Sequence, residues 1–300
     1  EERRMKSGIW KFLGEDPGLP GLTFRPVNVE EEKCQIDEVI TRSCRADGMD
    51  AGRQMRSCGW RPLTGAQAFD HRESVAAELN GRMVAYAELR PMAGEGQTGL
   101  IYQMDGYVLP EWRCCGIGSA LSEHIEEVCR RIEHKAAPSL DACARGVMTS
   151  RRQLLQDRGF VIWRYRFEFI HSNVGGVQAR EMPAGWEVSD GRGVQAKLLE
   201  IRQNGIPAAA VHLFTDGMEH CQPGKEIGYL EIESLEGTHI DPEMMGAILS
   251  RGLAASHARG LQQVLVNVDV DLPENAFDFG LYVELGFQLD HRLLMYRKAL

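Results

Sequence analysis

Residues 110–121, "PEWRCCGIGSAL", place an arginine and two glycines directly ahead of a segment with the apolar spacing of an amphipathic helix. The first backbone amides of a helix have no partner within it, and the helix dipole adds partial positive charge, so a helix N-terminus binds anions. Gly116 and Gly118 allow the backbone to approach a pyrophosphate, and Arg113 adds a charge-assisted hydrogen bond. The segment therefore predicts an anion site where a strand meets a helix.

The two glycines by themselves are a weak signal. They fit neither the G-x-G-x-x-G dinucleotide motif nor the G-K-S/T phosphate loop, and a tight turn into a surface helix explains them equally well. The longer pattern V-x-P-x-x-R-x-x-G-x-G-x-A-L, from Val108 to Leu121, is more specific because it joins a strand end, a loop and a helix start. In this form the segment resembles the GCN5-related N-acetyltransferases, the GNAT family.

The resemblance implies a site for acetyl-coenzyme A as co-substrate, and no metal. In the family, the motif R/Q-x-x-G-x-G/A wraps the pyrophosphate of acetyl-coenzyme A, and Arg113, Gly116 and Gly118 match that motif. The residues assigned to cofactor binding are Tyr107, Val108, Arg113, Cys114, Cys115, Gly116, Ile117, Gly118 and Ser119.

Acyl transfer to an amine also needs a group that lowers the protonation of the amine, and a backbone N–H that stabilises the oxyanion. In this fold the strand carrying Val108 splays from the next strand, and the pantetheine pairs with the exposed edge. The catalytic candidates are Glu88, Tyr102 and Asp105. Each has an alternative: Glu88 faces solvent on an alternating strand, Tyr102 packs in the core, and Asp105 is a bulge residue beside Gly106.

The later family signature is divided between the two halves of the chain. Its tyrosine commonly protonates the departing thiolate, but the first half has Met148 in place of the asparagine and Leu155 in place of the tyrosine. The second half keeps the signature, in Asn275, Leu281, Tyr282, Gly286 and Phe287.

The phosphate motif shows the opposite loss. Aligning "GSALS" with "GAILS" places Asp241, Met244 and Gly246 where the first half has its arginine and glycines. Asp241 and Glu243 would then lie beside the pyrophosphate, and like charges about 4 Å apart cost about 4 kcal/mol at an effective dielectric of 20. A thiolate can leave without a protein acid, whereas a domain without a phosphate site cannot position the cofactor. We therefore expect an active first half and a degenerate second half.

Strands and helices repeat along the chain in a way that predicts an α/β fold, with two tandem GNAT-like domains of mixed sheet flanked by helices. We expect an N-terminal extension at residues 1–21, a first domain at 22–172, a linker at 173–185 and a second domain at 186–300. A strand at 22–28 precedes a helix at 30–45, and Asn80-Gly81 predicts a hairpin. The second domain is predicted to repeat this opening, with a helix over "VQAKLLEIRQNG".

Composition limits the function classes. The 300 residues carry a formal net charge of -9, which argues against a general nucleic-acid binder. No apolar run approaches the roughly 20 residues of a membrane span, and no secretory signal is visible. The eight cysteines are scattered without a C-x-x-C pair, and no histidine spacing resembles a zinc site. We expect a cytoplasmic protein with reduced thiols, as a monomer or homodimer.

The predicted reaction is transfer of an acetyl or short acyl group from coenzyme A to a primary amine on a small molecule. Two alternatives stay open. One is a non-catalytic protein that binds acyl-coenzyme A in a regulatory role. The other follows from a resemblance to the tandem acetyltransferases of the mycothiol synthase type, which would make the acceptor an aminothiol.

Overall fold

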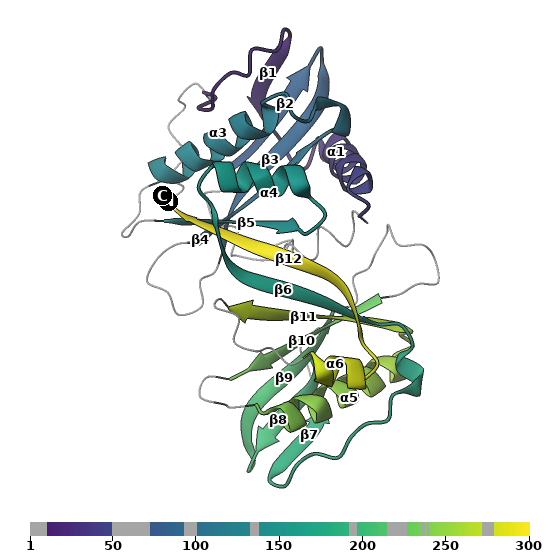
Figure 1. Cartoon of the computed structure of the whole chain (residues 1–300). Helices are drawn as coiled ribbons and strands as arrows, with labels where there is room; N and C mark the ends of the chain where they lie inside the picture. Colours follow the sequence, from purple (N-terminus) through teal and green to yellow (C-terminus); the bar gives the residue numbers. More distant parts are fainter. Residues whose placement is uncertain are drawn as a thin grey trace. The chain divides into compact units, whose positions relative to one another are not determined.

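The chain folds as two compact units, Glu1–Trp163 with Leu294–Leu300, and Arg164–Leu293. Figure 1 shows the computed structural model, coloured along the sequence. It describes residues 11–49, 73–92, 101–132, 138–191, 197–214, 227–235, 238, 240–271 and 279–300.

The first unit is built on a mixed sheet with the strand order β1-β2-β3-β4-β5 and then the end of β12. Neighbours from β1 to β4 are antiparallel, and β4 and β5 are parallel. The predicted hairpin is confirmed, because Asn80 and Gly81 have φ values of 50° and 81° between β2 and β3. The strands are β1 (Leu22–Pro26), β2 (Glu73–Leu79), β3 (Arg82–Met92), β4 (Ile101–Val108), β5 (Ser139–Arg145) and β12 (Gln288–Ala299).

Three α-helices belong to this unit: α1 (Lys33–Ala46), α3 (Ile117–Arg131) and α4 (Thr149–Asp157). The apolar face that the sequence predicts for α1 is buried, and both α1 and α3 contact β3 and β4. All nine interior residues of β3 are buried. Because successive side chains of a strand point to opposite faces, both faces of the sheet are covered at β3.

The N-terminal extension packs against α3 over the part that the structure describes. Phe12 stacks on Phe24 with ring centroids 3.8 Å apart, and the Leu13 N–H donates to His124 Nδ1 over 3.1 Å. A Cβ on Gly14 would lie 2.1 Å from the Ala120 carbonyl oxygen, so only glycine fits there. The sequence predicts an N-terminal extension here, and its docking on α3 is a finding of the structure.

The second unit has the strand order β12-β6-β11-β10-β9-β8-β7, in which β10 and β11 are parallel. Helix α5 (Pro242–Ala258) contacts β8 and β9, and α6 (Gly280–Glu284) is a short helix. The strands are β6 (Val161–His171), β7 (Trp186–Asp190), β8 (Lys197–Gln203), β9 (Ile206–Phe214), β10 (Ile227–Ser234) and β11 (Gln263–Asp271).

The helix predicted over residues 194–205 is wrong. Residues 197–203 form β8, which pairs with β7 and β9 in antiparallel register. Asn204 and Gly205 have φ values of 51° and 79°, so they form the same kind of hairpin turn as Asn80 and Gly81. The apolar residues Leu198, Leu199 and Ile201 fit a helical spacing, but the turn after them decides the structure.

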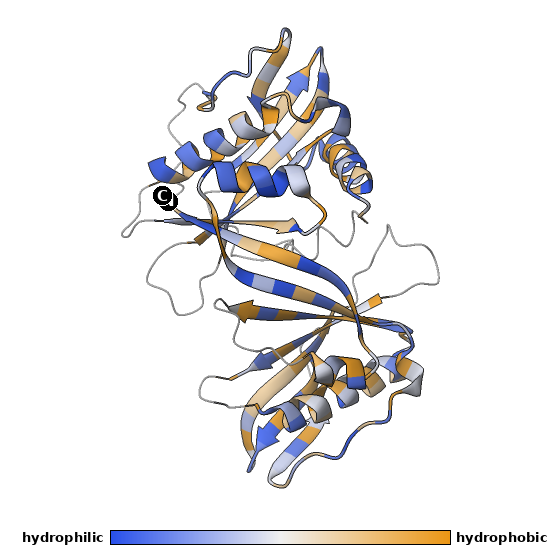
Figure 2. Cartoon of the chain, in the orientation of Figure 1, coloured by the Kyte–Doolittle hydropathy of each residue, from blue (hydrophilic) through white to orange (hydrophobic). Residues whose placement is uncertain are grey.

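Figure 2 shows hydrophobic residues along the strands of both units and a mostly hydrophilic α4, whose apolar residues are Leu154 and Leu155. Within the described residues, no helix has both the length and the apolar character needed to cross a membrane.

Candidate active site

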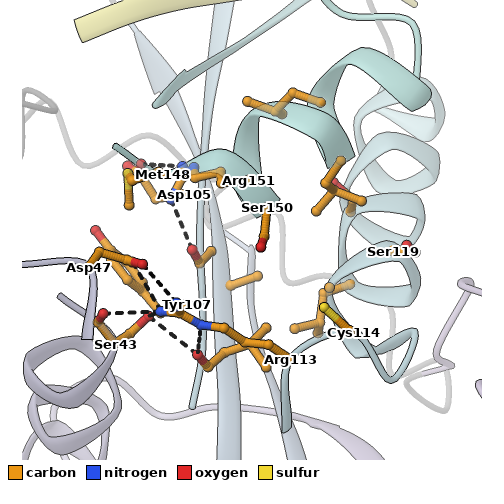
Figure 3. Close-up of a pocket in the computed structure, with 18 of the residues that line it drawn as sticks. Ser43, Asp47, Asp105, Tyr107, Arg113, Cys114, Ser119, Met148, Ser150 and Arg151 are labelled. Carbon is orange, nitrogen blue, oxygen red and sulfur yellow. Dashed lines mark hydrogen bonds and ion pairs between the residues drawn. The ribbon is translucent and has the colours of Figure 1, made fainter. Parts of the chain in front are cut away.

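A cavity of about 340 Å³ lies in the first unit. Its wall is formed mainly by the end of α1, the second half of β4, the loop before α3 with the first two turns of that helix, and α4 with the loop before it. Figure 3 shows Tyr107 and Arg113 on one side and Ser150 and Arg151 on the other. Part of the segment singled out in the sequence therefore lines a hollow large enough for a ligand.

One wall of the cavity is an open strand edge. Pairing between β4 and β5 ends at Gln103 and Asp141, so among the described residues the rest of β4 has no partner strand on this side. The carbonyl oxygens of Gly106 and Val108 accept side-chain hydrogen bonds there, from Arg151 over 2.9 Å and from Arg113 over 3.2 Å. The splay expected from the sequence is confirmed, and an extended ligand can pair with this edge.

The loop before α3 ends at Gly116 in a backbone conformation that favours glycine, whereas Gly118 lies within the helix. Gly116 is the N-cap residue of α3 with a φ of 85°, and no side chain of the described residues caps the helix. Gly116, Gly118 and Ser119 all line the cavity. A Cβ on Gly118 would lie 3.4 Å from Leu154 and 3.8 Å from Val108, so a larger side chain would fill the cavity. The start of α3 is therefore suited to an anion.

The model of the acetyltransferase (GNAT) family matches residues 45–160. The match contains the loop, the open edge of β4 and α4. Together with the solved structures below, it supports the GNAT acetyltransferase superfamily for this chain. No curated protein has a significant sequence match to the chain.

Solved GNAT structures share the fold along almost the whole chain. A GCN5-related N-acetyltransferase from Sphaerobacter thermophilus is 19% identical with a TM-score of 0.68, covering 94% of this chain and 96% of that one. A tandem GNAT protein from the clavulanic acid biosynthesis pathway is 14% identical, with a TM-score of 0.58 and coverage of 93% and 98%. The glucosamine N-acetyltransferase region of a fungal multi-domain β-N-acetylglucosaminidase is 11% identical, with a TM-score of 0.69 and coverage of 94% and 38%.

Arg113 of the GNAT motif ties the loop to α1. Its Nη1 donates to Asp47 Oδ1 over 2.7 Å, and its Nη2 donates to Asp47 Oδ2 over 3.0 Å and to Ser43 Oγ over 2.8 Å (Figure 3). Its Nε donates to the Val108 carbonyl. The contact of Arg113 with pyrophosphate stays a prediction, and the structure adds that this guanidinium holds the end of α1 beside the loop.

The remaining residues expected at a GNAT cofactor site divide into two groups. Tyr107, Val108 and Cys114 line the cavity together with the glycines. Cys115 and Ile117 do not line it: the Cys115 thiol donates to the Arg113 carbonyl over 3.4 Å, and Ile117 is fully buried in the core.

Glu88 is 1% exposed, so the alternative that it faces solvent is wrong. The Tyr86 hydroxyl donates to its Oε2 over 2.9 Å, and Arg90 Nε lies 3.0 Å from its Oε1. The cause is the covering of β3 on both faces, which leaves no solvent side for an alternating strand.

Asp105 lies opposite Glu88 and lines the cavity. The register of β3 and β4 is continuous through this pair, so the alternative that Asp105 is a bulge residue is wrong. Its carboxylate forms ion pairs with Arg90 Nη2 and with Arg151 Nη2, the latter at 3.4 Å. The structure thus brings two of the three catalytic candidates together, joined by Arg90.

Tyr102 belongs to the paired part of β4 and does not line the cavity. Its side chain is buried, and this burial raises the pKa of its hydroxyl. The position agrees with the alternative expectation of a packing residue.

Several residues of the cavity wall were not anticipated from the sequence: Ser43, Asp47, Thr149, Ser150 and Arg151. The sequence does contain an indication for Arg151, because this residue precedes Leu155 by one helical turn and therefore lies on the same face of the helix. Met148 and Leu155 both line the cavity. The wall therefore offers an apolar side chain at the position where a GNAT enzyme usually has its tyrosine.

In the second unit, the corresponding helix start is closed by its own residues. Asp241 Oδ1 accepts a hydrogen bond from the Met244 N–H over 2.8 Å, and Pro242 is the first residue of α5. The segment aligned with the loop before α3 is thus wound into a helical turn. A Cβ on Gly246 would lie 2.9 Å from Arg180 Nη1. Asp241 caps the helix and occupies the amide that an anion would need.

Tyr282 of the second unit is a core residue. Its ring stacks on Phe169 with centroids 4.6 Å apart, and burial raises the pKa of its hydroxyl to about 12. Asn275, from the same family signature, lies outside the described residues.

Among the described residues, no group of three or more His, Cys, Asp or Glu side chains is arranged to hold a metal ion. The cysteines that the structure describes are free thiols, with Cys114 exposed at the cavity. Cys58, Cys221, His220 and His239 lie outside the described residues.

Proposed function

We propose that this chain transfers an acetyl or short acyl group from acetyl-coenzyme A to a primary amine. One observation carries the proposal: the uncapped start of α3 and the open edge of β4 lie in the same cavity. The helix start suits a pyrophosphate, and the strand edge suits an extended chain that contains amide groups. Coenzyme A carries both parts, one joined to the other.

The residues present fit such a ligand. Gly116 and Gly118 line the cavity at the start of α3 without adding side chains of their own, and Ser119 adds a hydroxyl. The open edge of β4 from Met104 to Val108 offers backbone groups to the pantetheine arm. The end of α1, held by Arg113 and Asp47, closes another side of the cavity.

The reaction requires direct attack of a neutral amine on the thioester carbonyl. A backbone N–H at the open edge of β4 stabilises the oxyanion, as backbone donors do in other acyl transfers. Asp105 is the catalytic candidate that lines the cavity, and Glu88 supports it through Arg90. Leu155 donates no proton, so the thiolate leaves without a tyrosine acid from α4.

The tandem arrangement is also part of the proposal, with acetyltransferase-like domains at 22–172 and 186–300 and a degenerate second domain. The likeness to a tandem GNAT protein over 93% of this chain supports two such domains. The Asp241 cap on α5 supports the loss of the second anion site. The second domain then acts as a scaffold, in a monomer or a homodimer.

A second candidate function is a protein that binds acyl-coenzyme A without turning it over. The observation in its favour is the pairing of Glu88 and Asp105 with arginines, combined with the apolar Leu155 in the wall.

The acceptor in the proposed transfer reaction is a small amine. The fungal glucosamine N-acetyltransferase region makes amino sugars one class to test, and the mycothiol synthase resemblance makes aminothiols another.

Incubating the protein with acetyl-coenzyme A and a panel of amines, and following released thiol and acetylated product, separates the two candidates. Gly118→Asp should abolish turnover and weaken acetyl-coenzyme A binding by at least about 100-fold, because a carboxylate enters the anion site. Asp241→Ala is the matched control and should leave affinity within about twofold. Binding without product for every amine would support the regulatory function. A stronger effect from Asp241→Ala than from Gly118→Asp would assign the site to the other unit.

A further inference from the structure

Arg151 extends its guanidinium from α4 into the wall of the cavity (Figure 3). Its side chain is 13% exposed, so it is largely shielded from bulk water. Arg151 and Leu155 are four positions apart in a helix and both line the cavity. A permanent cation therefore lies one helical turn before Leu155 in this wall.

The charged residues that line the cavity, among those described, are Asp47, Asp105, Arg113 and Arg151. Arg113 faces both carboxylate oxygens of Asp47, at 2.7 and 3.0 Å, so its charge is balanced at close range. Arg151 Nη2 lies 3.4 Å from Asp105 Oδ1, and the Arg151 guanidinium lies 5.9 Å from the centroid of the Tyr107 ring. Arg151 is therefore a second cation held at the cavity wall, and its position along the wall decides which group of a ligand it faces.

The backbone contact of Arg151 shows where along the cavity this charge lies. Its Nη1 donates to the Gly106 carbonyl, which belongs to the open part of β4. The N–H and C=O of one residue point to the same edge of a strand, so the Gly106 N–H also faces the cavity. A thioester whose oxygen is held by that N–H would have Arg151 as the neighbouring cation.

We propose that Arg151 stabilises the coenzyme A thiolate as it leaves, an inference that rests on the proposed acetyl transfer. The amine nitrogen gives its electron pair to the carbonyl carbon, and the carbonyl π electrons move to oxygen. When the C=O bond re-forms, the C–S bond breaks and its electron pair stays on sulfur. The proton of the attacking nitrogen passes to water, so the products are the amide, the thiolate and a hydrated proton.

A cation suits this leaving group without supplying a proton. The ordinary pKa of a thiol is about 8.5, so a thiolate is only weakly basic at neutral pH. A guanidinium stays protonated throughout the working pH range and donates hydrogen bonds to negative charge at a fixed place. Arg151 is thus a catalytic residue for the departure of sulfur, on the same helix face as Leu155.

The test compares coenzyme A with desulfo-coenzyme A, which lacks the sulfur, by calorimetry from pH 6.5 to 9.5. In the wild type, coenzyme A should gain about tenfold in affinity over desulfo-coenzyme A as the pH rises, because the thiolate is bound preferentially. Arg151→Gln should make this ratio independent of pH, and Arg151→Lys should restore part of it. Arg152→Gln is the matched control, since Arg152 lies next in α4, donates to the Gly146 carbonyl and does not line the cavity.

Retained binding of desulfo-coenzyme A by Arg151→Gln shows that the variant is folded. Its kcat for acetyl transfer should then fall by about 100-fold, with the KM for acetyl-coenzyme A within about threefold. If the affinity ratio varies with pH in Arg151→Gln as it does in the wild type, or if the wild-type ratio does not vary with pH, the role of Arg151 is overturned. Either result leaves the proposed acetyl transfer in place. A wild type that binds neither ligand overturns the proposed function as well.

Discussion

At the residue scale, Tyr282→Phe tests the assignment of catalysis to the first unit. Tyr282 is buried in the second unit and stacks on Phe169, and phenylalanine keeps that stacking. Turnover with the best amine should therefore stay within about threefold of the wild type, with thermal unfolding as the check on folding. A loss of 100-fold or more in a folded variant would mean that the tyrosine acts as a general acid.

Single residues differ in how far the sequence indicates their role. The glycines of the loop are recognisable because anion binding at a helix start depends on backbone conformation, which glycine spacing indicates directly. The partners of Arg113 are not, because Ser43 and Asp47 lie 70 and 66 positions away. The same applies to Glu88 and Asp105, whose shared arginine appears only when β3 and β4 pair.

At the scale of elements, hairpin turns were more informative than apolar spacing. Residues 197–203 contain apolar residues at a spacing compatible with a helix, yet Asn204-Gly205 turns them into one arm of a hairpin. The helix expected at residues 30–45 is present as α1, with its apolar face buried. The packing of the N-terminal segment on α3 is not visible in the sequence, because contacts such as Leu13 with His124 span 111 positions.

Gly14→Val tests whether this N-terminal segment stabilises the first unit. Its new side chain would collide with the Ala120 carbonyl, where a Cβ already lies at 2.1 Å, so the segment has to move off α3. The Tm should fall by about 5 °C, following the loss of the Phe12 and Leu13 contacts. The control is Gly146→Ala, which meets nothing within 4 Å and should change the Tm by no more than about 1 °C. Equal Tm values for both variants would contradict the docking.

At the scale of the whole molecule, the chain returns to its first unit at the end. Residues 294–300 belong to that unit, and Lys298 Nζ donates to Glu126 Oε2 of α3 over 2.7 Å. Arg158 Nε donates to the other oxygen of Glu126 over 2.5 Å. Burial opposes ionisation of this carboxyl, but the hydrogen bonds from Arg158 and Lys298 outweigh it and hold the pKa of Glu126 below its ordinary 4.5.

A lowered pKa in the folded state means that Glu126 contributes stability above about pH 4.5, and that this contribution is lost as the pH falls through the folded pKa. Glu126→Gln should lower the free energy of unfolding by about 2 kcal/mol at pH 7. The free energy of unfolding of this variant should also fall less than that of the wild type when the pH is lowered. Urea unfolding at pH 7 and pH 4 measures both effects. Glu127→Gln, at a more exposed ion pair of the same helix, should have a much smaller effect. A similar loss in both variants would show that the return of the C-terminal strand is not held by Glu126.

The number of acetyl-coenzyme A molecules bound per chain tests the central claim most directly. The start of α3 is uncapped and lines a cavity, whereas the start of α5 is capped by Asp241. Isothermal titration calorimetry of the full chain with acetyl-coenzyme A should therefore give one site per chain, and Gly118→Asp should remove it. Two equivalent sites, or a single site that survives Gly118→Asp, would contradict the account.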